Sequence, residues 1–237
     1  VRKVEPDYYT DAMTYTQVSV IEESATGPLI DDPTGRLPWP SGWGEVAIVE
    51  KVVGYKKIKF FTHENAGYGD VRLPEMQMHT TAFWLTLPEA VVASVAAGRP
   101  AAIDGLRGVG LALETVSTLA LMCDPRDLGT ALGDVDEPDD GAGDANAAGD
   151  SPAPLARAMP SVRQGGRRGY HPTLFLYEHV PGGTGLAERI WEQRDALLGR
   201  TREMIEGCPC PTGCPACVGP GDATRKAVAL LLLRAVS

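Results

Sequence analysis

The chain of 237 residues has no excess of positive charge and no long apolar run. Lysine and arginine number 22 against 31 acidic residues, giving a formal net charge of -9, which excludes a uniformly basic coat for nucleic acid. The longest apolar stretch, VALLLLRAV at 228–236, is interrupted by Arg234 and is too short to span a membrane, and the N-terminus has no signal-peptide core. We therefore expect a soluble, cytoplasmic protein without membrane contact.

Cysteine is scarce outside one short segment, and nucleotide-binding motifs are missing. With 43% hydrophobic residues, a chain of this length buries a core without needing disulfides. No GxxxxGK[ST] pattern occurs, so we expect no ATP site, and no carboxylate or histidine cluster has the spacing of a catalytic centre. The chain also begins at Val1 without an initiator methionine, which we interpret as a fragment of a larger protein.

Strand-like and helix-like patterns follow one another along the chain and predict an α+β fold. The first part, 1–98, is β-rich, with strands expected at 14–21, 45–62 and 77–87. The second part, 99–237, is mainly helical, and the two parts could form one continuous module. In addition to a short helix at 89–97, we expect a buried helix at 103–123, an apolar strand at 173–180, one helix ending at Gly207 and a final helix at 222–236.

Residues 133–168 differ from the rest of the chain in composition. They are rich in Ala, Gly, Asp and Pro and poor in aromatic and β-branched residues, which predicts a disordered insertion. Its basic end, Arg163, Arg167 and Arg168, is a candidate for phosphate contacts, although a solvated linker is the simpler interpretation.

Four of the five cysteines lie in GCPCPTGCPAC at 207–217, and their spacing predicts a metal site. Cys208, Cys210, Cys214 and Cys217 follow the pattern C-x-C-x3-C-x2-C, in which proline and glycine supply the sharp turns of a loop around one ion. Four thiolates suit structural zinc and leave no open position for catalysis, although an iron–sulfur cluster uses the same ligands. Cys123 is expected to be a core thiol.

Two further segments are candidate contact sites. GYKKIKFFTHE at 54–64 interleaves Lys56, Lys57 and Lys59 with aromatic residues, which fits a surface for single-stranded DNA as well as it fits an edge strand protected by lysines. PGGTG at 181–185 lies between a strand and a helix, the arrangement that binds anions in nucleotide-binding loops, but packing alone explains its glycines. One of Glu178 and His179, just before the turn, is expected to point inward.

A set of longer segments resembles a known family. They are DYYTDAMTYTQV at 7–18, VVGYKKIKFFTHENAGYGDVRLPEMQMHTTAFWL at 52–85, LMCDPRDLG at 121–129, YEHVPGGTGLAERI at 177–190 and CPCPTGCPAC at 208–217. Together they resemble the C-terminal zinc-binding domain of bacterial superfamily-two DEAD/DEAH-box DNA helicases of the SftH and MrfA type, most of all the mycobacterial SftH branch. The resemblance covers most of the chain outside the insertion.

The resemblance implies that the four cysteines bind zinc and that the module follows two RecA-like motor domains in the same polypeptide. It also implies a parent protein that is an ATP-dependent 3′ to 5′ DNA helicase in DNA repair, nucleoid-associated, with ATP and magnesium bound only by the motor. We expect this chain to support the motor and engage single-stranded DNA. The alternative is a protein-interaction scaffold of a multi-subunit defence complex that does not bind DNA directly.

Overall fold

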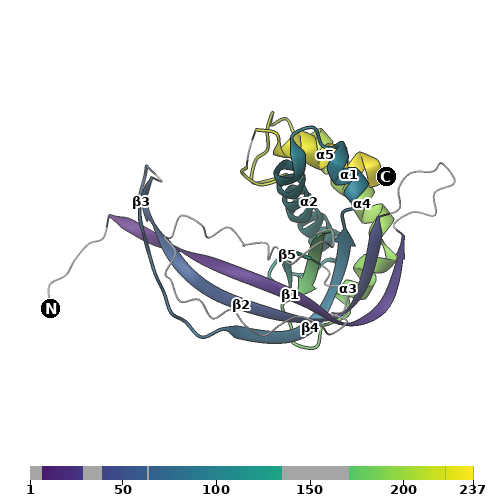
Figure 1. The fold of residues 1–237 in the computed structure, drawn as a ribbon, viewed down its shortest axis with the longest axis horizontal. Helices are drawn as coiled ribbons and strands as arrows, with labels where there is room; N and C mark the ends of the chain where they lie inside the picture. The colour runs from purple at the N-terminus through teal and green to yellow at the C-terminus, as the bar shows by residue number, and fades with distance from the viewer. Residues whose placement is uncertain (1–6, 29–38, 63, 135–170, 222, 237) are drawn as a thin grey trace, which may run out of the picture.

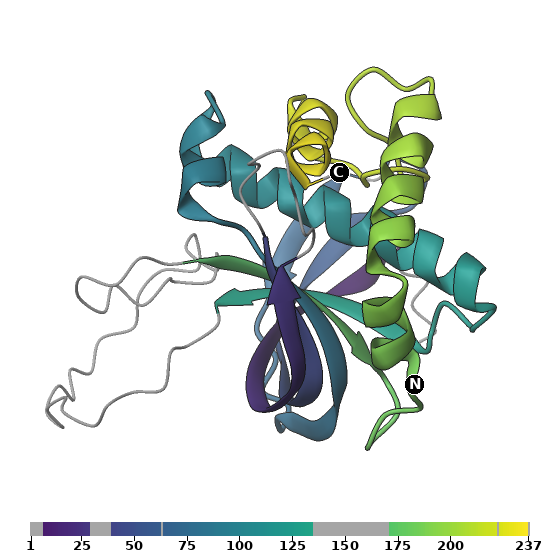
Figure 2. The ribbon, with the colours of Figure 1, turned by 90° about the vertical axis from the view of Figure 1, so that its right-hand side faces the viewer.

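The computed structural model describes residues 7–28, 39–62, 64–134, 171–221 and 223–236. Within them, six strands form one sheet, and the helices gather mainly on one side of it (Figures 1 and 2). The α+β prediction is confirmed. The elements are β1 (Tyr8–Pro28), β2 (Pro40–Lys59), β3 (Asn65–Gly69), β4 (Met76–Thr86), α1 (Glu89–Ser94), α2 (Gly98–Leu121), β5 (Leu128–Asp134), β6 (Pro172–Glu178), α3 (Leu186–Glu192), α4 (Arg194–Gly207) and α5 (Arg225–Val236).

Every strand pair of the sheet is antiparallel, and the order is β1-β2-β4-β6-β5. The short strand β3 pairs only with the end of β2. Strands β5 and β6 come from the second half of the sequence, and β6 pairs directly with β4. The division into two parts at residue 98 stays a prediction, and the hydrogen bonding of the sheet runs across it.

The first two strands are much longer than the rest of the sheet requires, and their ends form a projecting arm. Strand β2 pairs with β4 through residues 41–50 and then continues to Lys59 with β1 on one side and β3 on the other. Figure 1 shows this end of the sheet reaching away from the helices. We call residues 8–13, 54–62 and 64–69 the β-arm. It is held by backbone pairing, whereas in the rest of the sheet helices pack against β2, β4, β5 and β6.

Helix α2 is the centre of the helical layer. Its apolar residues join those of β4 and β6, such as Leu85 and Leu174, in the main core between the sheet and the helices. Glycines let it lie close to its neighbours on both sides, since a Cβ on Gly110 would come within 2.6 Å of Leu174 in β6. The sequence predicted a helix buried on nearly all sides, but only half of its residues are buried, and Arg107, Thr115 and Leu119 are exposed. A second, smaller core, which includes Trp84 and Phe175, lies on the other face of the sheet.

The structure corrects four expectations about the elements. The helix expected up to Gly207 is two helices, α3 and α4, which meet at Gln193. Strand β2 begins at Pro40, before the predicted start at residue 45, and strand β3 lies where no strand was predicted. Strand β5 was not predicted, and it includes residues 133–134, which we had assigned to the insertion. The rest of the predicted insertion, 135–168, lies outside the described residues.

Among the described residues, no helix combines the length and the apolar character needed to cross a membrane.

Candidate metal centre

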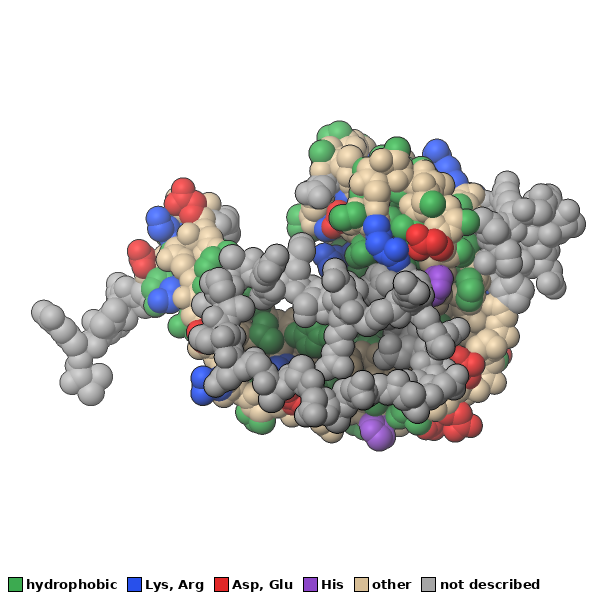
Figure 3. All heavy atoms as spheres, viewed as in Figure 1, with side chains coloured by type: hydrophobic (Ala, Val, Ile, Leu, Met, Phe, Trp, Pro, Cys, Tyr) green, Lys and Arg blue, Asp and Glu red, His purple; other side chains and the backbone are tan. Residues whose placement is uncertain are grey.

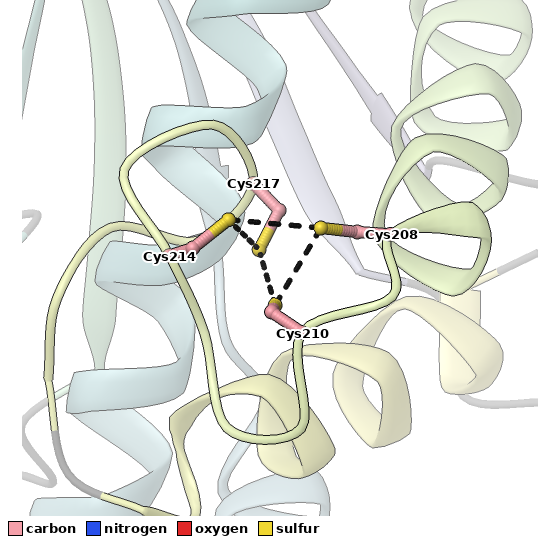
Figure 4. Close-up of side chains that lie close together, drawn as sticks. All are labelled: Cys208, Cys210, Cys214 and Cys217. Carbon is pink, nitrogen blue, oxygen red and sulfur yellow. Dashed lines mark hydrogen bonds between the residues drawn. The ribbon is translucent and has the colours of Figure 1, made fainter.

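The four clustered cysteines converge on one point in space. Their Sγ atoms all lie within 4.8 Å of one another, and Figure 4 shows the four side chains pointing inward from the loop that follows α4. Four of the sulfur–sulfur distances are 3.4 to 3.6 Å. Cys217 is buried and the other three cysteines are half-buried, so the cluster lies at the edge of the core and is shielded on one side.

The backbone of the loop explains how residues so close in sequence can converge. Helix α4 ends at Gly207, and the extended backbone of the next residue, Cys208, directs the chain away from the helix axis. The carbonyl of Cys214 accepts hydrogen bonds from the N–H groups of Cys217 and Gly219, both at 3.0 Å, which closes a tight turn around the second pair of ligands. Gly213 and Gly219 have φ values of 136° and 72°, a region that favours glycine. The glycines therefore give the loop its two sharpest bends.

The cluster has the size and chemistry of a site for one metal ion. All five cysteines are free, and the sulfur–sulfur distances far exceed a disulfide bond of about 2.05 Å. A zinc–sulfur bond of about 2.3 Å places tetrahedral ligands about 3.8 Å apart, close to the spacing found here. A cluster of several irons with bridging sulfides would hold the thiolates further apart. The spacing therefore favours a single ion.

The electrostatics of the loop also suit a bound cation. Hydrogen bonds from the backbone N–H of Cys210 and from the neighbouring thiols lower the pKa of Cys208 to about 7. Burial and the neighbouring thiols raise the pKa of Cys210 to about 12. Four thiolates this close together repel one another, so all four ionise only around a cation.

Cys123 does not belong to this cluster. It follows the left-handed residue Met122 at the end of α2 and packs against the main core. Burial, with Asp127 nearby, raises the pKa of its thiol. A neutral core thiol, as expected from the sequence, fits these surroundings.

The predicted lysine surface lies on the β-arm, but its three lysines do not share a face. Lys57 and Lys59 point to one side of β2, whereas Lys56 points to the other side and lies opposite Asp11 and Tyr68. The Lys57 ammonium lies 5.2 Å from the centre of the Tyr8 ring, and Lys59 forms an exposed ion pair with Glu64 at 3.2 Å.

The aromatic residues near the lysines also differ from the prediction. The predicted strand at 45–62 includes Phe61, but Phe61 lies in the turn after β2 with a φ of 70°, and its side chain is 97% exposed. Its neighbour Phe60 packs against Tyr9, with ring centres 5.7 Å apart. Positive, negative and apolar side chains stand beside one another at the far end of the arm (Figure 3). The other predicted contact residues, Arg163, Arg167 and Arg168, lie outside the described residues.

The PGGTG turn surrounds a buried carboxylate of the protein itself, that of Glu178. Glu178 is 0% exposed, whereas His179 is exposed, so Glu178 is the inward-pointing residue of the pair. Its carboxylate accepts hydrogen bonds from the hydroxyls of Thr81 and Thr184, both at 2.6 Å, from the N–H of Ala187 at 3.0 Å and from the N–H of Thr184. The backbone donors that bind phosphate in nucleotide-binding loops are therefore used here by the protein's own side chain.

These hydrogen bonds determine the ionisation of Glu178. Burial alone raises the pKa of a carboxyl group, but the donors from Thr184, Thr81 and Ala187 outweigh burial and hold the pKa of Glu178 below its ordinary value. An ionised carboxylate that is saturated with donors inside the core is suited to a structural role. Among the described residues, the lining of the neighbouring groove includes His79, His179 and the turn residue Gly182 but not Glu178.

Sequence analysis missed the polar residues that hold the metal loop in place. Arg225 and Lys226, in the first turn of α5, donate hydrogen bonds to carbonyls of the loop, and Arg225 also pairs with Asp104 of α2. The sequence did contain a signal for these two residues. Two adjacent cations at the start of a helix are unfavourable in the field of the helix dipole, which indicates that they have a role outside the helix itself.

Comparisons with known proteins agree with this metal loop. Residues 109–218 match the model of the MrfA Zn-binding domain family. Over 219 residues, the chain is 31% identical to a Bacillus subtilis protein named as the uncharacterized ATP-dependent helicase YprA, covering 92% of this chain and 24% of that protein. A 45-residue segment is 42% identical to the Druantia protein DruE of Escherichia coli, covering 19% of this chain and 2% of DruE.

A solved structure extends the likeness to the fold. The crystal structure of the DUF1998 helicase MrfA bound to DNA matches 100% of this chain and 26% of its own, with a TM-score of 0.62 and 28% identity. The chain thus spans about a quarter of the length of the helicases it matches.

Proposed function

We propose that this chain, whose residues 109–218 match the model of the MrfA Zn-binding domain family, is a zinc-stabilised accessory module of an ATP-dependent 3′ to 5′ DNA helicase that acts in DNA repair. In this proposal, ATP and magnesium bind only to RecA-like motor domains of the same polypeptide. The module itself supports the motor and engages DNA. The similarity to helicases over almost the whole chain supports this assignment.

The observation that carries the proposal is the convergence of the four thiol groups within 4.8 Å. We assign Cys208, Cys210, Cys214 and Cys217 as the ligands of one zinc ion. Four protein ligands complete a tetrahedral shell, so the ion has no position for a reacting water and its role is structural. Its binding free energy then contributes to folding of the loop between α4 and α5.

Metal analysis tests this assignment directly. We expect the purified chain to contain one zinc ion, and Cys214→Ser to lose it, because three thiolates leave an incomplete site. The matched control is Cys123→Ser, which changes a cysteine outside the cluster and should keep one zinc per chain. Iron in the wild type, paired cysteines without metal, or full zinc content in Cys214→Ser would each contradict the assignment.

We further propose that the β-arm contacts single-stranded DNA through the face that carries Lys57 and Lys59. On this face the Lys57 ammonium lies over the Tyr8 ring, and the exposed ring of Phe61 lies in the turn at the end of the arm. Ammonium groups suit phosphates and exposed rings suit unpaired bases. That MrfA, a relative of similar fold, has been crystallised with DNA also supports this role. Lys56, on the other face, is expected to contribute less.

The salt dependence of binding tests the DNA proposal in the full-length protein. Replacing Lys57 and Lys59 by glutamine removes two phosphate contacts. The negative slope of log K against log salt for a single strand should therefore become shallower by about 1.4. Lys51→Gln is the control, because Lys51 is an exposed lysine of the same strand, paired with Glu75 and closer to the body. An unchanged slope in the double variant would refute the role of this face.

A protein-binding role is the second candidate, and the mixed charge of the β-arm favours it. Lys59 is paired with Glu64, and Asp11 lies opposite Lys56, so the arm does not present a purely positive surface. The similarity of 45 residues to a Druantia protein is compatible with a module that occurs in different assemblies. Under this alternative, the double lysine variant would bind DNA as the wild type does but would lose a protein partner.

A further inference from the structure

Helix α5 begins with two adjacent cations, Arg225 and Lys226, that both point into the metal loop. Both side chains are largely buried, at 7% and 9% exposed. A buried lysine is rare unless it is paired, because its ammonium loses the stabilisation that water provides. The position also opposes the helix dipole, which favours negative charge at this end. Neither helix formation nor solubility explains a cation here.

The two residues hold opposite ends of the loop. Arg225 donates to the carbonyls of Val218 and Pro220, just after the last cysteine. Lys226 donates from Nζ to the carbonyls of Cys208 at 2.6 Å and Cys210 at 2.7 Å. The first turn of α5 thus fixes both the segment that carries the first two thiols and the segment that follows the last.

The charges of the two residues are balanced differently. Arg225 forms a two-point ion pair with Asp104 of α2, which neutralises it. Among the described residues, no carboxylate lies within ion-pair distance of Lys226. Within the same described part of the chain, the ammonium group of Lys226 donates hydrogen bonds to two carbonyl oxygens, and both belong to cysteines of the cluster. One positive charge is therefore left facing the cysteine loop.

A zinc ion with four thiolates carries a net charge of about −2, since four negative ligands surround one divalent cation. Partly buried, such a centre needs nearby cations or hydrogen-bond donors. Among the described residues of α5, Arg225 and Lys226 donate hydrogen bonds to the loop, and the charge of Arg225 is offset by Asp104 of α2. Lys226 therefore brings to the cysteine loop a positive charge that no carboxylate of the described residues pairs with.

We propose that Lys226 is a positioning residue of the metal site. It holds the Cys208–Cys210 segment in the conformation that presents both thiols, and it offsets part of the negative charge of the zinc–tetrathiolate centre. This inference rests on the assignment of zinc to the four cysteines and adds a determinant of metal affinity that is not itself a ligand.

Zinc affinity measured by chelator competition on the full chain tests the proposal. Removing the ammonium in Lys226→Met, which keeps the apolar stem, should weaken zinc binding by about 10- to 100-fold, the usual cost of losing a partner of the metal ligands. Lys226→Arg, which keeps a positive donor, should restore most of the affinity. Arg234→Met is the matched control, because Arg234 is an exposed cation of the same helix, paired with Glu206.

The outcomes separate this inference from the zinc assignment itself. A wild-type chain that binds no zinc refutes the assignment, whereas a zinc-binding wild type with Lys226→Met within twofold of it overturns only the role of Lys226. Equal loss in Lys226→Met and Lys226→Arg would also overturn it, because a purely steric role gives no rescue by a second cation. Should Lys226→Met fail to fold, the comparison of Lys226→Arg with the uncharged Lys226→Gln decides the same question.

Discussion

Replacing Glu178 by glutamine tests whether the buried carboxylate locks the PGGTG turn to the sheet. In the wild type, four donors from Thr81, Thr184 and Ala187 converge on two carboxylate oxygens. The glutamine amide keeps one acceptor oxygen. Its NH2 group replaces the other oxygen and cannot accept the hydrogen bonds that this oxygen accepted. The change leaves the shape almost unaltered, so the measured effect reports charge and hydrogen bonding.

The expected cost follows from these contacts. Hydrogen bonds to a charged acceptor contribute about 1.5–3 kcal/mol each, and a buried donor left without a partner costs about 1–3 kcal/mol. Since the amide oxygen still serves some of the donors, we expect Glu178→Gln to lower the free energy of unfolding by about 3 kcal/mol. The assay is urea unfolding of the zinc-loaded chain near neutral pH.

Glu188→Gln is the matched control for this experiment. Glu188 undergoes the same chemical change in the first turn of α3, a few residues away, but its side chain is exposed. We expect it to change the free energy of unfolding by less than about 0.5 kcal/mol. If Glu178→Gln were as mild as Glu188→Gln, the carboxylate would not be the lock that its contacts suggest.

The pH dependence of this difference provides a second check. Because the folded-state pKa of Glu178 lies below its ordinary value, the ionised carboxylate stabilises the fold at pH values above that ordinary value. This contribution is lost as the pH falls through the lowered folded-state pKa. The gap between wild type and Glu178→Gln should therefore be constant from about pH 6 to 8 and shrink in acid. A gap that widened in acid would contradict the assigned charge state.

Two glycine substitutions make a contrasting pair that unfolding experiments can compare. Gly183→Ala should destabilise the chain by about 1–3 kcal/mol, because Gly183 has a φ of 73° and an added Cβ would lie 2.3 Å from the Thr81 hydroxyl. Gly199→Ala, inside α4 with no atom within 4 Å of the added Cβ, should be neutral or stabilise by up to about 1 kcal/mol. A stabilising Gly183→Ala would show that the turn relaxes freely around Thr81.

The metal loop was predictable from the sequence because its parts are local. Cys208 and Cys217 are close in the chain, and the turns between them depend on neighbouring glycines and prolines. The partners of Glu178 and Lys226 were harder to predict. Thr81 lies 97 residues before Glu178 in sequence, and only the pairing of β4 with β6 brings the two together. Contacts made by tertiary structure leave little trace in a local pattern.

The errors in the predicted elements have similar causes. Strand β5 has a weak strand sequence, LGTALGD, and it is formed because β6 pairs with it along its whole length. The expected single helix breaks at Gln193, where Arg194 donates a hydrogen bond to the carbonyl of Trp191 and stacks on its ring. In both places the hydrogen bonds come from a neighbouring strand or side chain, and local sequence propensity does not predict such bonds.

Helix α2 is the element through which the metal loop can influence the sheet. On one side a Cβ on Gly108 would come within 3.0 Å of Val218, the residue after the last cysteine, and Asp104 binds Arg225. On the other side α2 lies against Leu174 of β6. In the part of the chain that the structure describes, the β-arm is tied to the body by the pairing of its strands. Zinc should therefore stabilise the helical layer directly and the β-arm only through the sheet that both share.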